Sequence, residues 1–203
     1  MTKNLKGLKE ELGDTLLVAV SKNQSLQKII ELYNQGQRDF GENKIQEIFG
    51  KAQALPNDIR WHMIGQVQRN KLSKLLSIPN LVAIHSVDRL ALLEELIKSQ
   101  VNCDLYLQVN TSGEKEKSGF KNFEQLEGAY QLSHKNVCIK GLMTIGAIRS
   151  EDFERDANLC FSKLKKMRDK LNPKLKLSMG MSQDYKIALK HGSTCVRIGS
   201  ALF

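Results

Sequence analysis

The feature that most constrains this sequence is a regular alternation of short apolar runs with segments of helical periodicity. The apolar runs are rich in β-branched residues, and no linker rich in proline, glycine or serine separates them. Eight runs can be counted as candidate strands: Leu16–Val20, Asp39–Glu42, Trp61–Ile64, Val82–Val87, Leu105–Val109, Ile139–Ile145, Leu175–Met179 and Cys195–Ile198. Strands that alternate with helices are typical of a parallel sheet, and that is the sheet we expect.

The segments between the strands carry the start and stop signals of helices. Ser25 is placed to cap a helix that stops at Gly36, while Asp88 and Asn122 are placed to cap two others. The longest helix follows Asp152, and its apolar side chains recur at helical spacing: Phe153, Ala157, Cys160, Phe161, Leu164, Met167 and Leu171. We interpret these apolar stripes as surfaces that face the core.

Eight β/α units predict an α/β fold with a single (β/α)8 TIM-type barrel, formed by residues 1–203 as one domain. An open, doubly wound sheet would give a similar string of elements. The sequence has no GxGxxG after the first strand and no GxxxxGK[ST], so dinucleotide-binding and P-loop sheets lose their main support.

The net charge and the cysteine content limit the kinds of partner and cofactor that the sequence can be expected to bind. The net charge is +9, which suits a nucleic acid, a phosphorylated ligand or a lysine-rich solvated surface, but no basic run is interleaved with aromatic residues. No apolar run is long enough to span a bilayer, and we expect a cytoplasmic protein without a membrane partner. The four cysteines form no CxxC or Cys/His cluster, so neither a metal site nor a disulfide framework is expected.

Polar residues at the ends of the predicted strands mark the candidate site, because β/α barrels bind ligands at the carboxyl ends of their strands. Lys22 directly follows an apolar strand, where a lysine can be partly desolvated and its neutral amine can condense with an aldehyde. A solvated surface lysine would fit the same position. Asn43 follows the second strand and either faces a ligand or starts the next helix, and Glu42 beside it is a candidate to orient Lys22.

A second cluster near the last two strands has the features of a phosphate site. β/α barrels often bind phosphate with the loops after strands seven and eight and with a helix N-terminus. The segment SMGMSQD puts Ser182 at the start of a predicted helix, and RIGS supplies the bare backbone of Gly199 and the hydroxyl of Ser200. A capped helix and a tight turn would use the same residues.

Arg197 and His62 complete the set of candidates. Arg197 lies in the last strand near the barrel mouth, where its permanent guanidinium either donates to a neutral ring nitrogen of a ligand or forms a salt bridge. His62 is more typical of a hydrogen-bonded core histidine than of a base, and the other histidines show no partner pattern.

Several motifs occur in the order of a known family: LLVAVSKNQS, FGENKIQE, WHMIGQVQRNK, IHSVDR, LQVNTSGEKEKSG, GLMTIGA, LSMGMSQDY and GSTCVRIGSALF. From about Leu16 onward the chain resembles the pyridoxal-phosphate homeostasis proteins. The resemblance implies a fold-type III barrel, like the N-terminal domain of alanine racemase, that carries pyridoxal 5′-phosphate as a Schiff base on Lys22. It also implies a pyridine-nitrogen contact from Arg197, a cofactor-facing Asn43, and phosphate contacts from Ser182, Gly199 and Ser200.

The sequence departs from the family pattern at four places. Lys44 stands where an aromatic residue is common, Gln66 where a histidine is frequent, and Ser200 where threonine is usual, which keeps the hydroxyl. The sequence stops at Phe203, before the glycine and arginine with which the family usually continues, so either the closing helix turn is shortened or the sequence is trimmed.

The resemblance implies a binding protein of intracellular pyridoxal-phosphate homeostasis without an established catalytic reaction. We expect a monomer whose partners are the cofactor and amino acids. The alternative is an amino-acid racemase or decarboxylase on the same barrel, but racemisation needs an acid and a base on opposite faces of the substrate, and a second domain to supply one of them is not expected. A basic nucleic-acid-binding module is the third alternative; it predicts an affinity that falls steeply with salt, and we expect no such binding.

Overall fold

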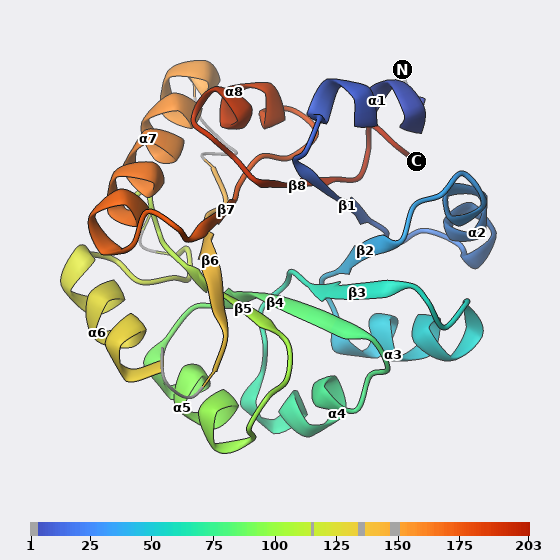
Figure 1. The fold of residues 1–203 in the computed structure, drawn as a ribbon, viewed down its shortest axis with the longest axis horizontal. Coiled ribbons are helices and arrows are strands. Elements are labelled where there is room, and N and C mark those ends of the chain that lie inside the picture. Colours follow the sequence, from blue (N-terminus) through green and yellow to red (C-terminus); the bar gives the residue numbers. More distant parts are fainter. Residues whose placement is uncertain (1–3, 115, 134–136, 147–150) are drawn as a thin grey trace.

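A closed barrel of eight parallel strands forms the centre of the molecule (Figure 1). The computed structural model describes residues 4–114, 116–133, 137–146 and 151–203. The strands are β1 (Leu16–Val20), β2 (Asp39–Glu42), β3 (Arg60–Met63), β4 (Leu81–Val87), β5 (Asp104–Gln108), β6 (Ile139–Met143), β7 (Lys176–Ser178) and β8 (Cys195–Ile198). Each strand pairs with its neighbours in the sequence, and β8 pairs with β1 to close the barrel. The predicted α/β class and (β/α)8 barrel are therefore confirmed.

The helices form a ring around the barrel (Figure 1). They are α1 (Leu5–Leu12), α2 (Leu26–Asn34), α3 (Ile45–Ala54), α4 (Leu72–Leu76), α5 (Leu90–Lys98), α6 (Phe123–Ser133), α7 (Phe153–Leu171) and α8 (Tyr185–Lys190), with a short 3₁₀ helix, η1 (Arg69–Lys71), before α4. Helices outside and a parallel sheet inside bury the strands on both faces, which explains their near-continuous apolar sequences.

Helix α1 was not predicted from the sequence, and it closes the ring at the seam where β8 meets β1. In Figure 1 it lies beside α8. Tyr185 Oη donates a hydrogen bond of 2.9 Å to Glu11 Oε2, and Lys186 Nζ lies 3.2 Å from Glu11 Oε1. Among the described residues no helix follows β8, so α1 takes the place that an eighth β/α crossover would otherwise fill.

Most of the predicted helix signals are present. Ser25 accepts from the Lys28 amide, and Asn122 accepts from the Gln125 amide at 2.9 Å. Gly36 has a positive φ of 91° directly after α2, which favours glycine at a helix end. The predicted cap at Asp88 is wrong: α5 begins after Arg89, and the Asp88 carboxylate instead pairs with the Arg89 guanidinium and faces a cavity.

The core lies in the layer between strands and helices and inside the barrel. Phe40 and Trp61 are buried there with ring centroids 6.2 Å apart, and α7 buries Ala157, Cys160 and Phe161 as its stripe predicted. Burying side chains of this size contributes roughly 1.5–3 kcal/mol each. All four cysteines are free thiols. Within the described part of the chain, no helix combines the length and apolar character needed to cross a membrane.

Candidate functional site

A cavity of about 640 Å³ opens at the carboxyl ends of the strands, the face where the sequence placed the site. Its walls include all six residues singled out from the sequence: Lys22, Asn43, Ser182, Arg197, Gly199 and Ser200. These residues come from the ends of β1, β2, β7 and β8, which closure of the barrel brings around one opening. The structure thus gathers every predicted site residue into one place.

Lys22 stands in the turn after β1 and carries a free amine at the cavity wall. It makes no hydrogen bond or ion pair with any residue that the structure describes. Its side chain is exposed, so the partial desolvation expected from its position after an apolar strand is not seen. The cavity's other lysine, Lys117, is engaged: its Nζ lies 2.6 Å from Glu114 Oε1 and 3.1 Å from the Gly146 carbonyl. Lys22 is therefore the more available nucleophile.

A buried ion pair supports the strand ends that carry Lys22 and Asn43. Lys51 Nζ, on α3, donates to Glu42 Oε1 at 2.6 Å and to the Ser21 carbonyl at 2.8 Å. The Ser21 hydroxyl also donates to Glu42 Oε1, at 2.7 Å. Burial raises the pKa of Glu42, although the bonds from Lys51 and Ser21 act in the opposite direction. Glu42 does not line the cavity, and its side-chain hydrogen bonds among the described residues are with Ser21 and Lys51 rather than with Lys22.

Asn43 is held at the cavity by close backbone packing. A Cβ added to Gly65 would lie 2.2 Å from the Asn43 carbonyl oxygen, so only glycine permits this approach of the two loops. The alternative of Asn43 as a helix cap is not seen, because Lys44 occupies the cap of α3 and no side-chain cap bond forms. Gln66, in the position where the family frequently has histidine, also lines the cavity and donates to Ser118 Oγ at 3.2 Å.

The loops after β7 and β8 meet at the cavity next to the end of β1, where a Cβ added to Gly199 would lie 3.2 Å from the Val20 carbonyl oxygen. The Gly199 amide donates to Ser182 Oγ at 3.3 Å, which joins the two loops directly, and Ser200 follows Gly199 in an exposed turn. Ser182 does not start the helix as predicted: α8 begins at Tyr185 after Asp184, whose carboxylate accepts from the Met181 amide. Two hydroxyl groups and bare backbone therefore face the cavity here, and together they form a set of donors suited to an anion.

Arg197 lies at the floor of the cavity with 4% of its surface exposed. Its guanidinium donates to Ser178 Oγ at 2.6 Å and to the Thr144 carbonyl at 2.8 Å, and burial lowers the pKa of Arg197. It makes no ion pair with any described carboxylate, so the salt-bridge alternative is wrong. A guanidinium has five N–H donors, and those left over by these two bonds can meet a ligand.

The sequence missed several cavity residues and one buried partner. Gln108 and Asn110, at the end of β5, line the cavity, as does Asp184, and burial raises the pKa of the Asp184 carboxyl. The sequence feature that could have identified these cavity residues is their position after predicted strands. His62 is a buried, hydrogen-bonded core histidine, which is the interpretation that the sequence favoured. The sequence did not indicate that His85 is its hydrogen-bond partner.

The chemistry of the cavity suits a phosphorylated aromatic aldehyde. A free primary amine, hydroxyl and amide groups that can donate to an anion, and a buried cationic donor all line this one cavity. The volume falls within the range of small-molecule sites. The residues present therefore fit a ligand with a carbonyl carbon, a ring nitrogen and a phosphate.

Comparison with known proteins gives consistent results. The family described as alanine racemase, N-terminal domain, matches residues 1–203. The pyridoxal phosphate homeostasis protein of Schizosaccharomyces pombe is 41% identical over 199 residues, which cover 94% of this chain and 84% of the relative. The corresponding protein of Helicobacter pylori (strain ATCC 700392 / 26695) is 42% identical over 194 residues, with 92% and 86% covered.

Solved structures extend the comparison to three dimensions. PipY of Synechococcus elongatus with PLP bound has a TM-score of 0.84 at 32% identity, covering 98% of this chain and 97% of its own. Alanine racemase from Corynebacterium glutamicum has a TM-score of 0.72 at 16% identity and is covered over 58% of its length. The second likeness shows a shared fold alone.

Proposed function

The chain belongs to the family of pyridoxal phosphate homeostasis proteins, and from this membership we propose that it binds pyridoxal 5′-phosphate in the barrel cavity and acts in homeostasis of that cofactor. The observation that carries the proposal is the meeting of a free Lys22 amine, a buried Arg197 and the Ser182–Gly199 pair around one cavity. The PLP-bound relative with the same barrel supports it.

In this proposal each site residue has a distinct task. Pyridoxal phosphate supplies an aldehyde that condenses with a primary amine, and Lys22 is the amine that holds it as a Schiff base. Arg197 donates to the ring nitrogen and cannot accept from it, which keeps that nitrogen unprotonated. Asn43 faces the ring from the end of β2. The exposure of Lys22 leaves the bond open to incoming amines, including amino acids, as a carrier requires.

The phosphate is assigned to Ser182, Gly199 and Ser200. We expect Ser182→Ala to raise the dissociation constant for pyridoxal phosphate by about tenfold, because one hydrogen bond to a charged group is lost. Isothermal titration measures the change. Pyridoxal, which lacks the phosphate, is the matched control ligand, and its affinity should not change. An equal loss of affinity for both ligands would contradict the phosphate assignment.

The proposed function is tested by trapping the cofactor on the whole protein. Borohydride reduction after addition of pyridoxal phosphate should add to the intact chain the mass of one cofactor, less the water released on condensation and plus the two hydrogens of reduction, and peptide mapping should place this group on Lys22. Labelling distributed over surface lysines in proportion to their exposure would refute a built site.

We also propose that residues 1–203 act as one binding domain and as a monomer in the cytoplasm. One cavity, lined by residues from the first strand to the last, supports the single domain, and four free cysteines suit a reducing compartment. Sedimentation of the loaded and cofactor-free protein would reveal any dimer.

No observation favours the racemase or decarboxylase alternative, because the likeness to those enzymes concerns the fold.

A further inference from the structure

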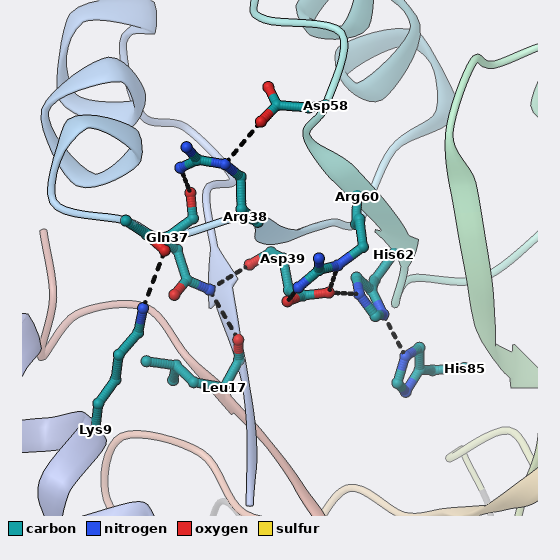
Figure 2. Close-up of polar contacts among 10 residues, drawn as sticks. Lys9, Leu17, Gln37, Arg38, Asp39, Asp58, Arg60, His62 and His85 are labelled. Carbon is teal, nitrogen blue, oxygen red and sulfur yellow. Dashed lines mark hydrogen bonds and ion pairs between the residues drawn. The ribbon is translucent and has the colours of Figure 1, made fainter.

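A chain of hydrogen bonds crosses the inside of the barrel and ends at Arg197. Its far end is Asp39, the first residue of β2, which accepts from Arg60 and lies 3.0 Å from His62 Nε2. Figure 2 shows Asp39 between Arg60 and His62, with His85 beyond. His62 Nδ1 lies 3.0 Å from His85 Nε2, and His85 Nδ1 lies 2.8 Å from Ser178 Oγ. The Arg197 guanidinium then donates to that hydroxyl at 2.6 Å.

The carboxylate end of this chain fixes the direction of every bond in it when both imidazoles are neutral. Arg197 can only donate, and an ionised Asp39 can only accept. With both imidazoles neutral, one arrangement satisfies all links: the Ser178 hydroxyl donates to His85 Nδ1, His85 Nε2–H to His62 Nδ1, and His62 Nε2–H to Asp39. Each donor therefore points away from the cavity.

Burial and charge favour this arrangement. Asp39, His62, His85, Ser178 and Arg197 are all buried. Burial would raise the pKa of Asp39, but hydrogen bonds from Arg60 and His62 lower it to about 2, which makes the carboxylate a fixed anion. Burial, as the largest cause, lowers the pKa of His85 well below its ordinary value, and the guanidinium of Arg197 acts in the same direction. His85 also stacks on the Tyr106 ring, with centroids 4.3 Å apart and the planes within 5°.

We propose that Ser178, His85 and His62 are positioning residues that hold Arg197 in place to donate to the ring nitrogen of bound pyridoxal phosphate. The inference rests on the proposed function. Ser178 fixes one arm of the guanidinium and the Thr144 carbonyl fixes the other, so the remaining N–H groups face the cavity. Because every donor in the chain points away from the cavity, the chain holds no proton that it can pass to the ring nitrogen.

The test begins with Ser178→Ala, which removes the hydroxyl between Arg197 and His85 with little change in volume. We expect the dissociation constant for pyridoxal phosphate to rise about tenfold, and the absorbance maximum of the bound cofactor to shift as its ring nitrogen loses a fixed donor. Ser193→Ala is the matched control, since it removes another buried hydroxyl, bonded only to backbone carbonyls beside β7 and β8. It should leave the band unchanged.

A second pair of variants acts two links away from Arg197. His62→Phe removes both ring nitrogens, whereas His62→Gln keeps one donor and one acceptor. We expect the phenylalanine variant to shift the band as Ser178→Ala does, and the glutamine variant to restore it. Nitrogen-15 spectra of the cofactor-free protein should show the Nε2–H tautomer for both His62 and His85.

The outcomes separate the inference from the proposed function. A Lys22-dependent band that is identical in the wild-type protein, Ser178→Ala and His62→Phe would overturn the inference alone. An Nδ1–H tautomer at His85 would overturn it as well, because the chain would then run toward the cavity. A wild-type protein without any Lys22-dependent band would overturn both.

Discussion

Alanine in place of Lys22 is expected to abolish the imine absorbance of the loaded protein and to leave the borohydride-treated chain at its unmodified mass. The reason is that no other amine can replace it: among the described residues, Lys117 is the other lysine of the cavity, and Glu114 and the Gly146 carbonyl engage its ammonium. Absorbance titration and intact-mass spectrometry measure the loss, which we expect to exceed a hundredfold in affinity, or about 2.7 kcal/mol.

Lys44→Ala is the control for this experiment. Lys44 is near the same rim and its side chain is 70% exposed, but it lies outside the cavity and pairs with Glu47 at 3.5 Å. Its removal should change neither the band nor the mass shift. An adduct that persists in Lys22→Ala and maps to Lys117 would show that the site holds its aldehyde elsewhere.

Lys51→Met is expected to destabilise the protein by about 3–5 kcal/mol, because it leaves the carboxylate of Glu42 buried without its cationic partner. Glu42 is fully buried, and its Oε2 atom already lacks a hydrogen-bond partner. Lys51 also holds the Ser21 carbonyl next to Lys22, so the binding of pyridoxal phosphate should weaken with the loss of stability. Urea unfolding measures the change in free energy.

The pH dependence and a double variant identify the cause of this loss. Burial raises the pKa of Glu42 above its ordinary value of 4.5, so folding favours the protonated acid. The resulting stability is present below that value and is lost as the pH rises through the raised pKa. The deficit of Lys51→Met should therefore shrink in acid. Adding Glu42→Gln should restore most of the stability at neutral pH; an equal deficit in the double variant would point to lost packing instead.

The barrel was predictable because its strands are buried on both faces. Leu16–Val20, Asp39–Glu42 and Cys195–Ile198 have the predicted bounds, and the first of them is an apolar run that ends where a polar loop begins. The strand predicted at Leu175–Met179 is shorter, from Lys176 to Ser178, because pairing with the neighbouring strands, rather than apolar character, sets its ends. Helix α1 was missed, and its polar contacts with α8 join residues that lie far apart in the sequence, such as Tyr185 and Glu11, which are 174 positions apart.

The site residues that lie at the ends of strands could be predicted from the sequence. Lys22 and Arg197 follow or end apolar strands, and a barrel gathers such positions at one mouth. The exposure of these side chains and their hydrogen-bond partners could not be predicted from the sequence. Exposure of Lys22 depends on neighbouring loops, and the bond between His85 and Ser178 joins residues 93 positions apart. Periodicity carries no information on such pairs.

The seam between β8 and β1 has a consequence for synthesis on the ribosome. Lys22 follows β1 and Arg197 lies in β8. Because these two strands pair at the seam, both residues line one cavity. A nascent chain that has not yet released β8 lacks Arg197 at the floor of the cavity and the loop that carries Gly199 and Ser200. We therefore expect the emerging polypeptide to bind pyridoxal phosphate only once β8 has paired with β1, and a translation product truncated before β8 not to bind it.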